Sequence, residues 1–133
     1  MNPKNAIKTM LWLLGTVVLF HLCIVLKIIP HEITWGGRLK NDSEMYVFEA
    51  VSITVNVFLI FVLLIKGKYL REIIPVKSTN ITLWIFLVLF GLNTLGNALA
   101  KTNFEKSFTL LTLASAVLIW IILRKTKNET DVN

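Results

Sequence analysis

The sequence predicts an all-α fold, a membrane-embedded antiparallel bundle of four helices. Over 133 residues the chain is 55% hydrophobic and its mean hydropathy is +0.69, which is too apolar for an ordinary soluble domain of this length. A helix that crosses a bilayer needs about 20 apolar residues, and four such runs use up most of the chain. The whole chain, residues 1–133, is therefore expected to form a single transmembrane domain.

The first span is predicted over residues 9–29, after a short polar start that contains Lys4 and Lys8. A basic start before an apolar core is also typical of a secretory signal peptide. Here the apolar run is longer than a signal core, and no small-residue cleavage motif follows it. We interpret the run as a retained helix that ends before Pro30, because proline disfavours helical backbone in the residue that precedes it.

The longest polar interruption, residues 29–49, separates the first two spans. It contains Trp35, Gly36, Gly37 and Arg38. Paired glycines permit a tight turn with positive φ, and tryptophan is enriched at the membrane–water interface. Two interpretations stay open: the loop recognises a partner, or it is a turn that an interfacial tryptophan anchors.

The second span is predicted over residues 45–65. Asn41 precedes it as a candidate N-cap, and Gly67 follows it, flanked by two lysines that favour a helix C-terminus. The third span is predicted over residues 81–100.

The fourth span is predicted over residues 104–123. Thr102 and Glu105 have the capping-box spacing at its start, in which each side chain satisfies a free backbone amide of the other. A basic cluster follows the span, and residues 124–133 are predicted to form a flexible tail.

The distribution of positive charge predicts the orientation. With both termini on one side, that side holds nine of the 14 Lys and Arg residues: Lys4, Lys8, Lys66, Lys68, Arg71, Lys77, Arg124, Lys125 and Lys127. A positive excess marks the cytoplasmic side, so both termini and the tail are predicted to be cytoplasmic in a bacterial inner membrane. Charges at helix ends indicate topology and not a nucleic-acid stripe. The expected partners are the lipid bilayer and either a second copy of the chain or another membrane protein.

Several polar residues lie inside the predicted spans. An ionisable residue there is energetically costly and is a candidate functional residue by default; one histidine and one glutamate meet this condition. Glu49 shares a helix face with Ser52 and Asn56, at spacing i, i+3, i+7. Asn93 and Asn97 lie four residues apart on the third span. The candidate pocket residues are His21, Glu49, Ser52, Asn56, Asn93 and Asn97.

Two interpretations of these polar faces are open. If the faces meet, they line a pocket that opens toward the outer loop, with Lys27, Arg38 and Lys101 around its rim. Alternatively, asparagine and serine serve as interhelical hydrogen-bonding groups, each worth about 0.6–2 kcal/mol, and Glu49 reaches water or pairs with Lys27 or Arg38. The structural interpretation is the favoured one.

The sequence lacks the residues that several kinds of functional site require. Cys23 is the only cysteine, so an internal disulfide, a CxxC pair and a cysteine zinc site are excluded. The His and Glu residues lack metal-ligand spacing, and bis-histidine haem binding would need a second histidine inside a span. Nucleotide-binding and nucleophile-elbow motifs are missing. We therefore expect no metal site and no cofactor, and we assign no catalytic residue.

Three functions remain. The favoured one is a non-enzymatic small-molecule or lipid binder, or an accessory subunit, which predicts a closed pocket without a continuous polar path. The alternative is a small, dimeric, proton-coupled transporter with Glu49 as carrier, which predicts polar lining through to the cytoplasmic side. The least favoured is a membrane-embedded enzyme, which predicts Glu49 and His21 within hydrogen-bond reach.

One family resemblance covers nearly the whole chain. The segments IPHEITWGGRLKNDSEMYVFE, LNTLGN and KTNFEK resemble an uncharacterised family of small bacterial four-helix membrane proteins. The resemblance implies the four-helix architecture and carries no known activity. The chain is also similar in size to DoxX-like proteins and to small multidrug-resistance transporters. The essential glutamate of those transporters lies in the first helix, where this chain has His21 and no acid.

Overall fold

The computed structural model describes residues 2–30, 41–100 and 103–132. Its helices are α1 (Pro3–Val25), α2 (Asp42–Lys66), α3 (Val76–Ala98) and α4 (Asn103–Val132). These ranges contain no strand, so the predicted all-α fold is confirmed. Each helix contains a stretch long and apolar enough to cross a membrane, which in α4 is Asn103–Arg124. This composition suggests a multi-pass membrane protein.

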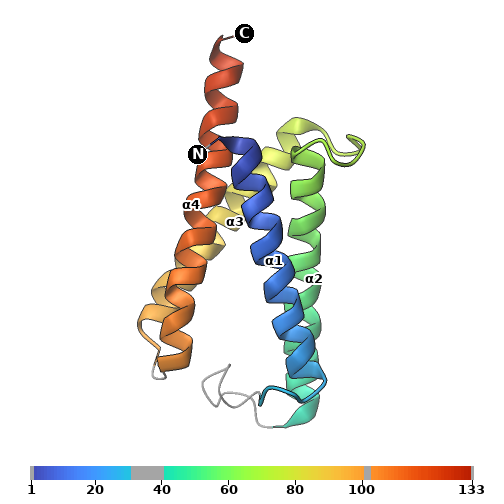
Figure 1. The fold of residues 1–133 in the computed structure, drawn as a ribbon, viewed down its shortest axis with the longest axis vertical. Helices are drawn as coiled ribbons and strands as arrows, with labels where there is room; N and C mark the ends of the chain where they lie inside the picture. The colour runs from blue at the N-terminus through green and yellow to red at the C-terminus, as the bar shows by residue number, and fades with distance from the viewer. Residues whose placement is uncertain (1, 31–40, 101–102, 133) are drawn as a thin grey trace.

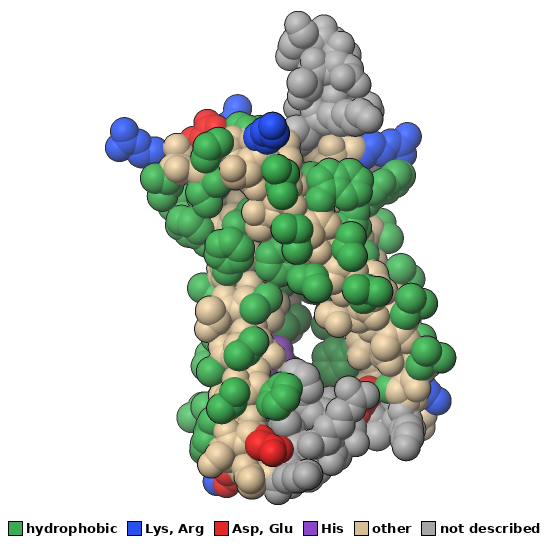
Figure 2. All heavy atoms as spheres, turned by 180° about the vertical axis from the view of Figure 1, so that it is seen from behind, with side chains coloured by type: hydrophobic (Ala, Val, Ile, Leu, Met, Phe, Trp, Pro, Cys, Tyr) green, Lys and Arg blue, Asp and Glu red, His purple; other side chains and the backbone are tan. Residues whose placement is uncertain are grey.

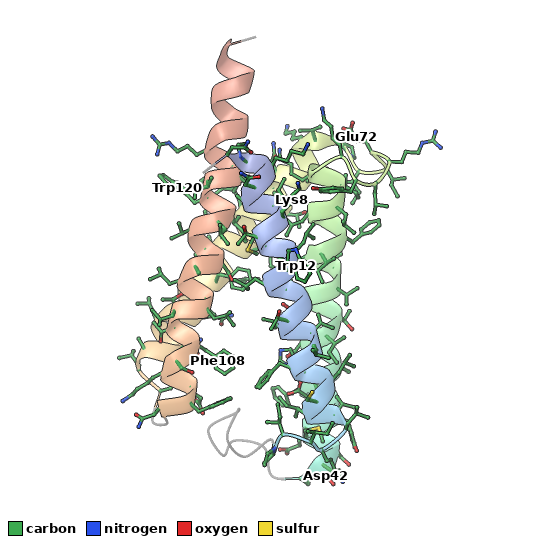
Figure 3. The ribbon with its side chains drawn as sticks, in the orientation of Figure 1. Lys8, Trp12, Asp42, Glu72, Phe108 and Trp120 are labelled. Atoms are coloured by element: carbon green, nitrogen blue, oxygen red, sulfur yellow. The ribbon has the colours of Figure 1, made fainter. Side chains whose placement is uncertain are left out.

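The helices form two antiparallel hairpins, α1 with α2 and α3 with α4 (Figure 1). We call the end where α1 and α3 begin and α2 finishes the terminal end, and the opposite end the loop end. Lys8 and Glu72 lie at the terminal end and Asp42 at the loop end (Figure 3). The hairpins lie close together at the terminal end and diverge toward the loop end (Figure 1). Between the hairpins, α1 packs on α4, whereas α2 and α3 touch little.

Helices α1 and α3 begin five or six residues before their predicted starts, at Pro3 and Val76. In α1 the Asn2 side chain accepts hydrogen bonds from the backbone N–H groups of Lys4 (2.7 Å) and Asn5 (3.2 Å), and Pro3 occupies the first helical position, where proline is favoured. Helix α3 begins directly after Pro75 instead of at residue 81. Polar first turns therefore extend these helices beyond their apolar runs.

Helices α1 and α2 end in the same left-handed turn, at Lys27 and Lys68, where φ is 63 in both. In each turn the N–H of the next residue donates to the carbonyl five positions earlier, at 2.9 Å, which is the main bond of a Schellman motif. Pro30 and Gly67, expected to mark these ends, do not supply the turn. Gly67 has φ −81, and a Cβ there would lie 2.9 Å from the Tyr69 ring, so its role is close packing.

Helix α4 differs from its prediction at its far end. Helical backbone continues to Val132, through most of the range predicted as a flexible tail, although the apolar stretch ends at Arg124. The guanidinium of Arg124 lies 5.0 Å from the ring centroid of Trp120, a cation–π contact at the end of the apolar stretch.

The main apolar core fills the terminal half of the bundle. All four helices contribute buried side chains to it, and the most deeply buried are Met10, Leu14, Leu59, Leu63, Leu83, Ile119 and Ile122. A small second cluster at the loop end joins Ile24 of α1 to Met45 of α2. Between these two clusters the hairpins separate, and the candidate site lies there.

Candidate functional site

A cavity of about 480 Å³ lies between the two hairpins on the loop side of the core. All four helices line it, mostly with apolar side chains such as Leu14, Phe86 and Leu111. Figure 2 shows a hollow on the rear face of the molecule, with a histidine side chain at its edge. From α4, Phe108 points toward the α1–α2 hairpin (Figure 3). The cavity is therefore an apolar chamber that is open at least on this face.

The structure brings the predicted pocket residues together. Five of the six line this cavity: His21, Ser52, Asn56, Asn93 and Asn97. The sixth, Glu49, lies behind His21, with which it is hydrogen-bonded, and its side chain is fully buried. Polar residues from α1, α2 and α3 that are far apart in the sequence thus line one cavity.

His21 and Glu49 form a buried acid–base pair across the α1–α2 interface. The Nδ1 atom of His21 and the Oε2 atom of Glu49 are 2.5 Å apart, and the exposed fractions of the two side chains are 15% and 0%. The Phe20 ring contacts the imidazole edge-on, with centroids 5.8 Å apart. Either partner is the donor, depending on which holds the proton. The pair can therefore exchange a proton at the cavity wall.

One interpretation of the sequence suggested that Lys27 pairs with Glu49, but Lys27 pairs with Asp42 instead. Its Nζ donates to the Asp42 carboxylate at 2.7 Å, and both side chains are about half exposed. This contact joins the end of α1 to the start of α2. The pKa of Lys27 is raised above its ordinary value of 10.5, because of this hydrogen bond and the charge of Asp42.

The Lys27–Asp42 contact predicts a specific dependence of stability on pH. Because the pKa of Lys27 is raised in the folded state, the contact with Asp42 stabilises that state fully below pH 10.5. This stabilisation disappears as the pH rises through the folded-state pKa of Lys27. We expect Lys27→Gln to lower the melting temperature at neutral pH and to lose this effect well above pH 10.5. Lys77→Gln, which removes the same charge at the terminal end, is the control. A deficit that persists in strong alkali would show that Lys27 acts through packing.

Some of the polar side chains have structural partners. The Asn56 amide donates to the Ser52 backbone carbonyl at 2.7 Å, and the Thr94 hydroxyl donates to the Thr112 hydroxyl at 3.0 Å, which links α3 to α4. The Asn56 bond lies within α2, whereas the Thr94–Thr112 bond joins two helices. The two interpretations of the predicted Asn and Ser residues therefore both stay predictions.

The sequence analysis missed the contribution of α4. Glu105, Thr112 and Ser115 line the cavity and are at most 9% exposed. Glu105, Phe108, Thr112 and Ser115 follow one another at intervals of 3, 4 and 3 residues, so they lie on one face of α4. That spacing was a usable signal, but Glu105 was assigned to a capping box. Thr102, the other member of the box, lies outside the described residues.

Other predicted features fall outside the ranges that the structure describes. These are the loop residues Trp35, Gly36, Gly37 and Arg38, together with the rim residue Lys101. Within the described ranges, no three His, Cys, Asp or Glu side chains are grouped so that they could hold a metal ion.

No family model, no curated protein and no solved structure matches the chain. The function must therefore be inferred from the geometry of the site itself.

Proposed function

We propose that the protein is a non-enzymatic membrane protein that binds a small amphipathic molecule or a lipid in the cavity between its hairpins, alone or as an accessory subunit. The single observation that carries this proposal is the cavity, in which apolar side chains from four helices surround a few convergent polar groups. Sites for small molecules are typically about 300–1,000 Å³ and have this composition. The cavity volume of about 480 Å³ falls within that range.

The closed terminal half supports a binder over a transporter. The core beyond the cavity consists of apolar side chains from all four helices, so no continuous polar path runs through it. With the basic termini in the cytoplasm, as the charge distribution indicates, the cavity lies in the outer leaflet of a bacterial inner membrane. The alternative, a proton-coupled transporter with Glu49 as carrier, would require this core to open.

A membrane-embedded enzyme is the second candidate, and the His21–Glu49 pair favours it. The two groups lie within hydrogen-bond reach at 2.5 Å, as the enzyme hypothesis predicts. His21 lines the cavity, so a proton on its imidazole is available to a bound molecule. The candidate reaction class is proton transfer to or from the bound molecule.

Filling the cavity from Gly96 tests the proposed function. Gly96 lines the cavity, and an added Cβ there meets no atom within 4 Å, so Gly96→Phe adds a ring at the cavity wall without a clash of its Cβ. The probes are photoreactive hexadecyl chains that end in trimethylammonium, hydroxyl or carboxylate, in nanodiscs of neutral phosphatidylcholine. We expect Gly96→Phe to reduce cavity labelling by at least one probe about tenfold, which corresponds to about 1.4 kcal/mol.

Gly91→Phe is the matched control, because Gly91 is equally open to a larger side chain and does not line the cavity. Labelled residues are mapped by mass spectrometry, and helix content is compared by circular dichroism. We expect Gly91→Phe to label as the unmodified protein does. If all three probes label the Gly96→Phe protein as strongly as the control, the cavity is not a binding site and the proposal is wrong.

A further inference from the structure

We propose that the molecule bound in this cavity is a cationic amphiphile, with an organic ammonium head on an apolar body, which enters sideways from the bilayer. This inference rests on the proposed function and specifies its ligand. Three observations carry it: the charges of the cavity wall, the aromatic cluster beside Glu105, and the sparse contact between α2 and α3.

The charges of the wall favour a cation. Glu105 lines the cavity, and Glu49 lies directly behind His21. Among the described residues that line the cavity there is no Lys or Arg, and Lys27, near the loop end, is engaged with Asp42. An anionic head group would therefore meet carboxyl groups without a permanently charged cation in the described wall. An ammonium head would meet an oxygen acceptor of the opposite charge.

An aromatic cluster includes Phe104 and Phe108, which flank Glu105 on α4. The ring centroids of Phe20, Phe104 and Phe108 lie 5.3 to 6.0 Å apart in pairs, and two of these residues, Phe20 and Phe108, line the cavity. Glu105 and Phe108 are three residues apart on α4, so they share a helix face. Ring faces attract ammonium groups, and aromatic sites are used to recognise quaternary ammonium ligands. A carboxylate beside such rings supplies both the charge and the faces for this head group.

The rest of the cavity suits an apolar body that arrives from lipid. Beyond the polar residues the lining is Leu14, Phe86, Leu89 and Leu111, which continues into the buried core. Helices α2 and α3 touch little, and the hollow in Figure 2 opens on the side of the molecule that lies behind in Figure 1. In a bilayer that side faces acyl chains, so a ligand with an alkyl tail can enter between these two helices.

The three probes described above test the inference directly. We expect the trimethylammonium probe to label the cavity at about tenfold lower concentration than the hydroxyl or carboxylate probe, the effect of one hydrogen bond or ion contact to a charged group. Glu105→Gln should remove most of this preference and leave hydroxyl labelling unchanged. Glu72→Gln is the matched control, because it neutralises an exposed acid at the terminal end, away from the cavity.

A second variant covers the case in which Glu105→Gln fails to fold. Phe108→Leu keeps an apolar side chain and removes the ring face, so it should weaken labelling by the ammonium probe alone. Soluble tetramethylammonium, which lacks an apolar body, should not compete with the ammonium probe; efficient competition would overturn the amphiphile and indicate a free cation.

The outcomes separate this inference from the proposed function. If the carboxylate or hydroxyl probe labels as well as the ammonium probe and Gly96→Phe suppresses that labelling, the binding function holds and the ammonium specificity is wrong. If Gly96→Phe suppresses labelling by none of the three probes, the proposed function and this inference fail together.

Discussion

Replacing His21 with leucine is expected to destabilise the folded protein by about 3 kcal/mol, the usual scale for removing one partner of a buried acid–base pair. The carboxyl group of Glu49 is fully buried and hydrogen-bonded to the His21 imidazole. In His21→Leu the carboxyl group stays in the same interior position and loses this partner. The quantity to measure is the free energy of unfolding in mixed micelles during a titration with a denaturing detergent.

A double-mutant cycle gives this experiment its control. In the double variant His21→Leu/Glu49→Leu both polar groups are replaced by apolar ones, which is often neutral for a buried pair, so most of the lost stability should return. Thr16→Val provides a mild substitution on α1, because the exposed Thr16 hydroxyl bonds only to its own helix, at the Trp12 carbonyl. If the losses in His21→Leu and in Glu49→Leu alone add up to the loss in the double variant, the pair is not coupled.

Truncating Leu63 is expected to cost about 2 kcal/mol, at the lower end of the range for buried leucine. Leu63 is fully buried in the core that all four helices share. Between helices in a bilayer the hydrophobic effect gives little driving force, so tight packing supplies the stability. Leu63→Ala removes this packing and leaves a void, and the loss is measurable by the same detergent titration.

Leu92→Ala is the comparison for this change, because the Leu92 side chain on α3 is 60% exposed. We expect it to alter stability by less than about 0.5 kcal/mol, as for surface positions generally. If the two substitutions had equal effects, the terminal half would not be the tightly packed part of the bundle. Labelling of the cavity by the probes should be unchanged in both variants.

The sequence predicted the helices well because apolar length dominates in this chain. Each of the four apolar runs became a helix, and the apolar stretch of α4 ends at Arg124, next to its predicted end. The starts of α1 and α3 were predicted too late, because hydropathy cannot detect a polar first turn held by the Asn2 cap or begun after Pro75. The Asn2 cap, given equal weight, would have moved the start of α1 earlier, and Pro75 marks the position before which α3 cannot easily extend.

The site was only partly predictable. The rise of about 1.5 Å per residue allowed His21 and Glu49 to lie at similar depth, but their contact also depends on how α1 and α2 rotate against each other, which spacing within one helix does not determine. The same limit applies to Lys27: its pairing with Asp42 instead of Glu49 depends on the left-handed turn that ends α1. The place of Glu105 in the cavity lining was missed, because its position in the first turn of a helix was already explained by the capping box.

The division of the bundle into a packed terminal half and a hollow loop half has an evolutionary consequence. The contacts that hold the helices together lie apart from most of the side chains that face the cavity. Substitutions at the cavity wall, such as those at Asn93 or Asn97, can therefore accumulate without loosening the fold. If the proposed binding function holds, a lineage that carries this architecture is free to exchange one ligand for another while the terminal half stays under constant selection for packing.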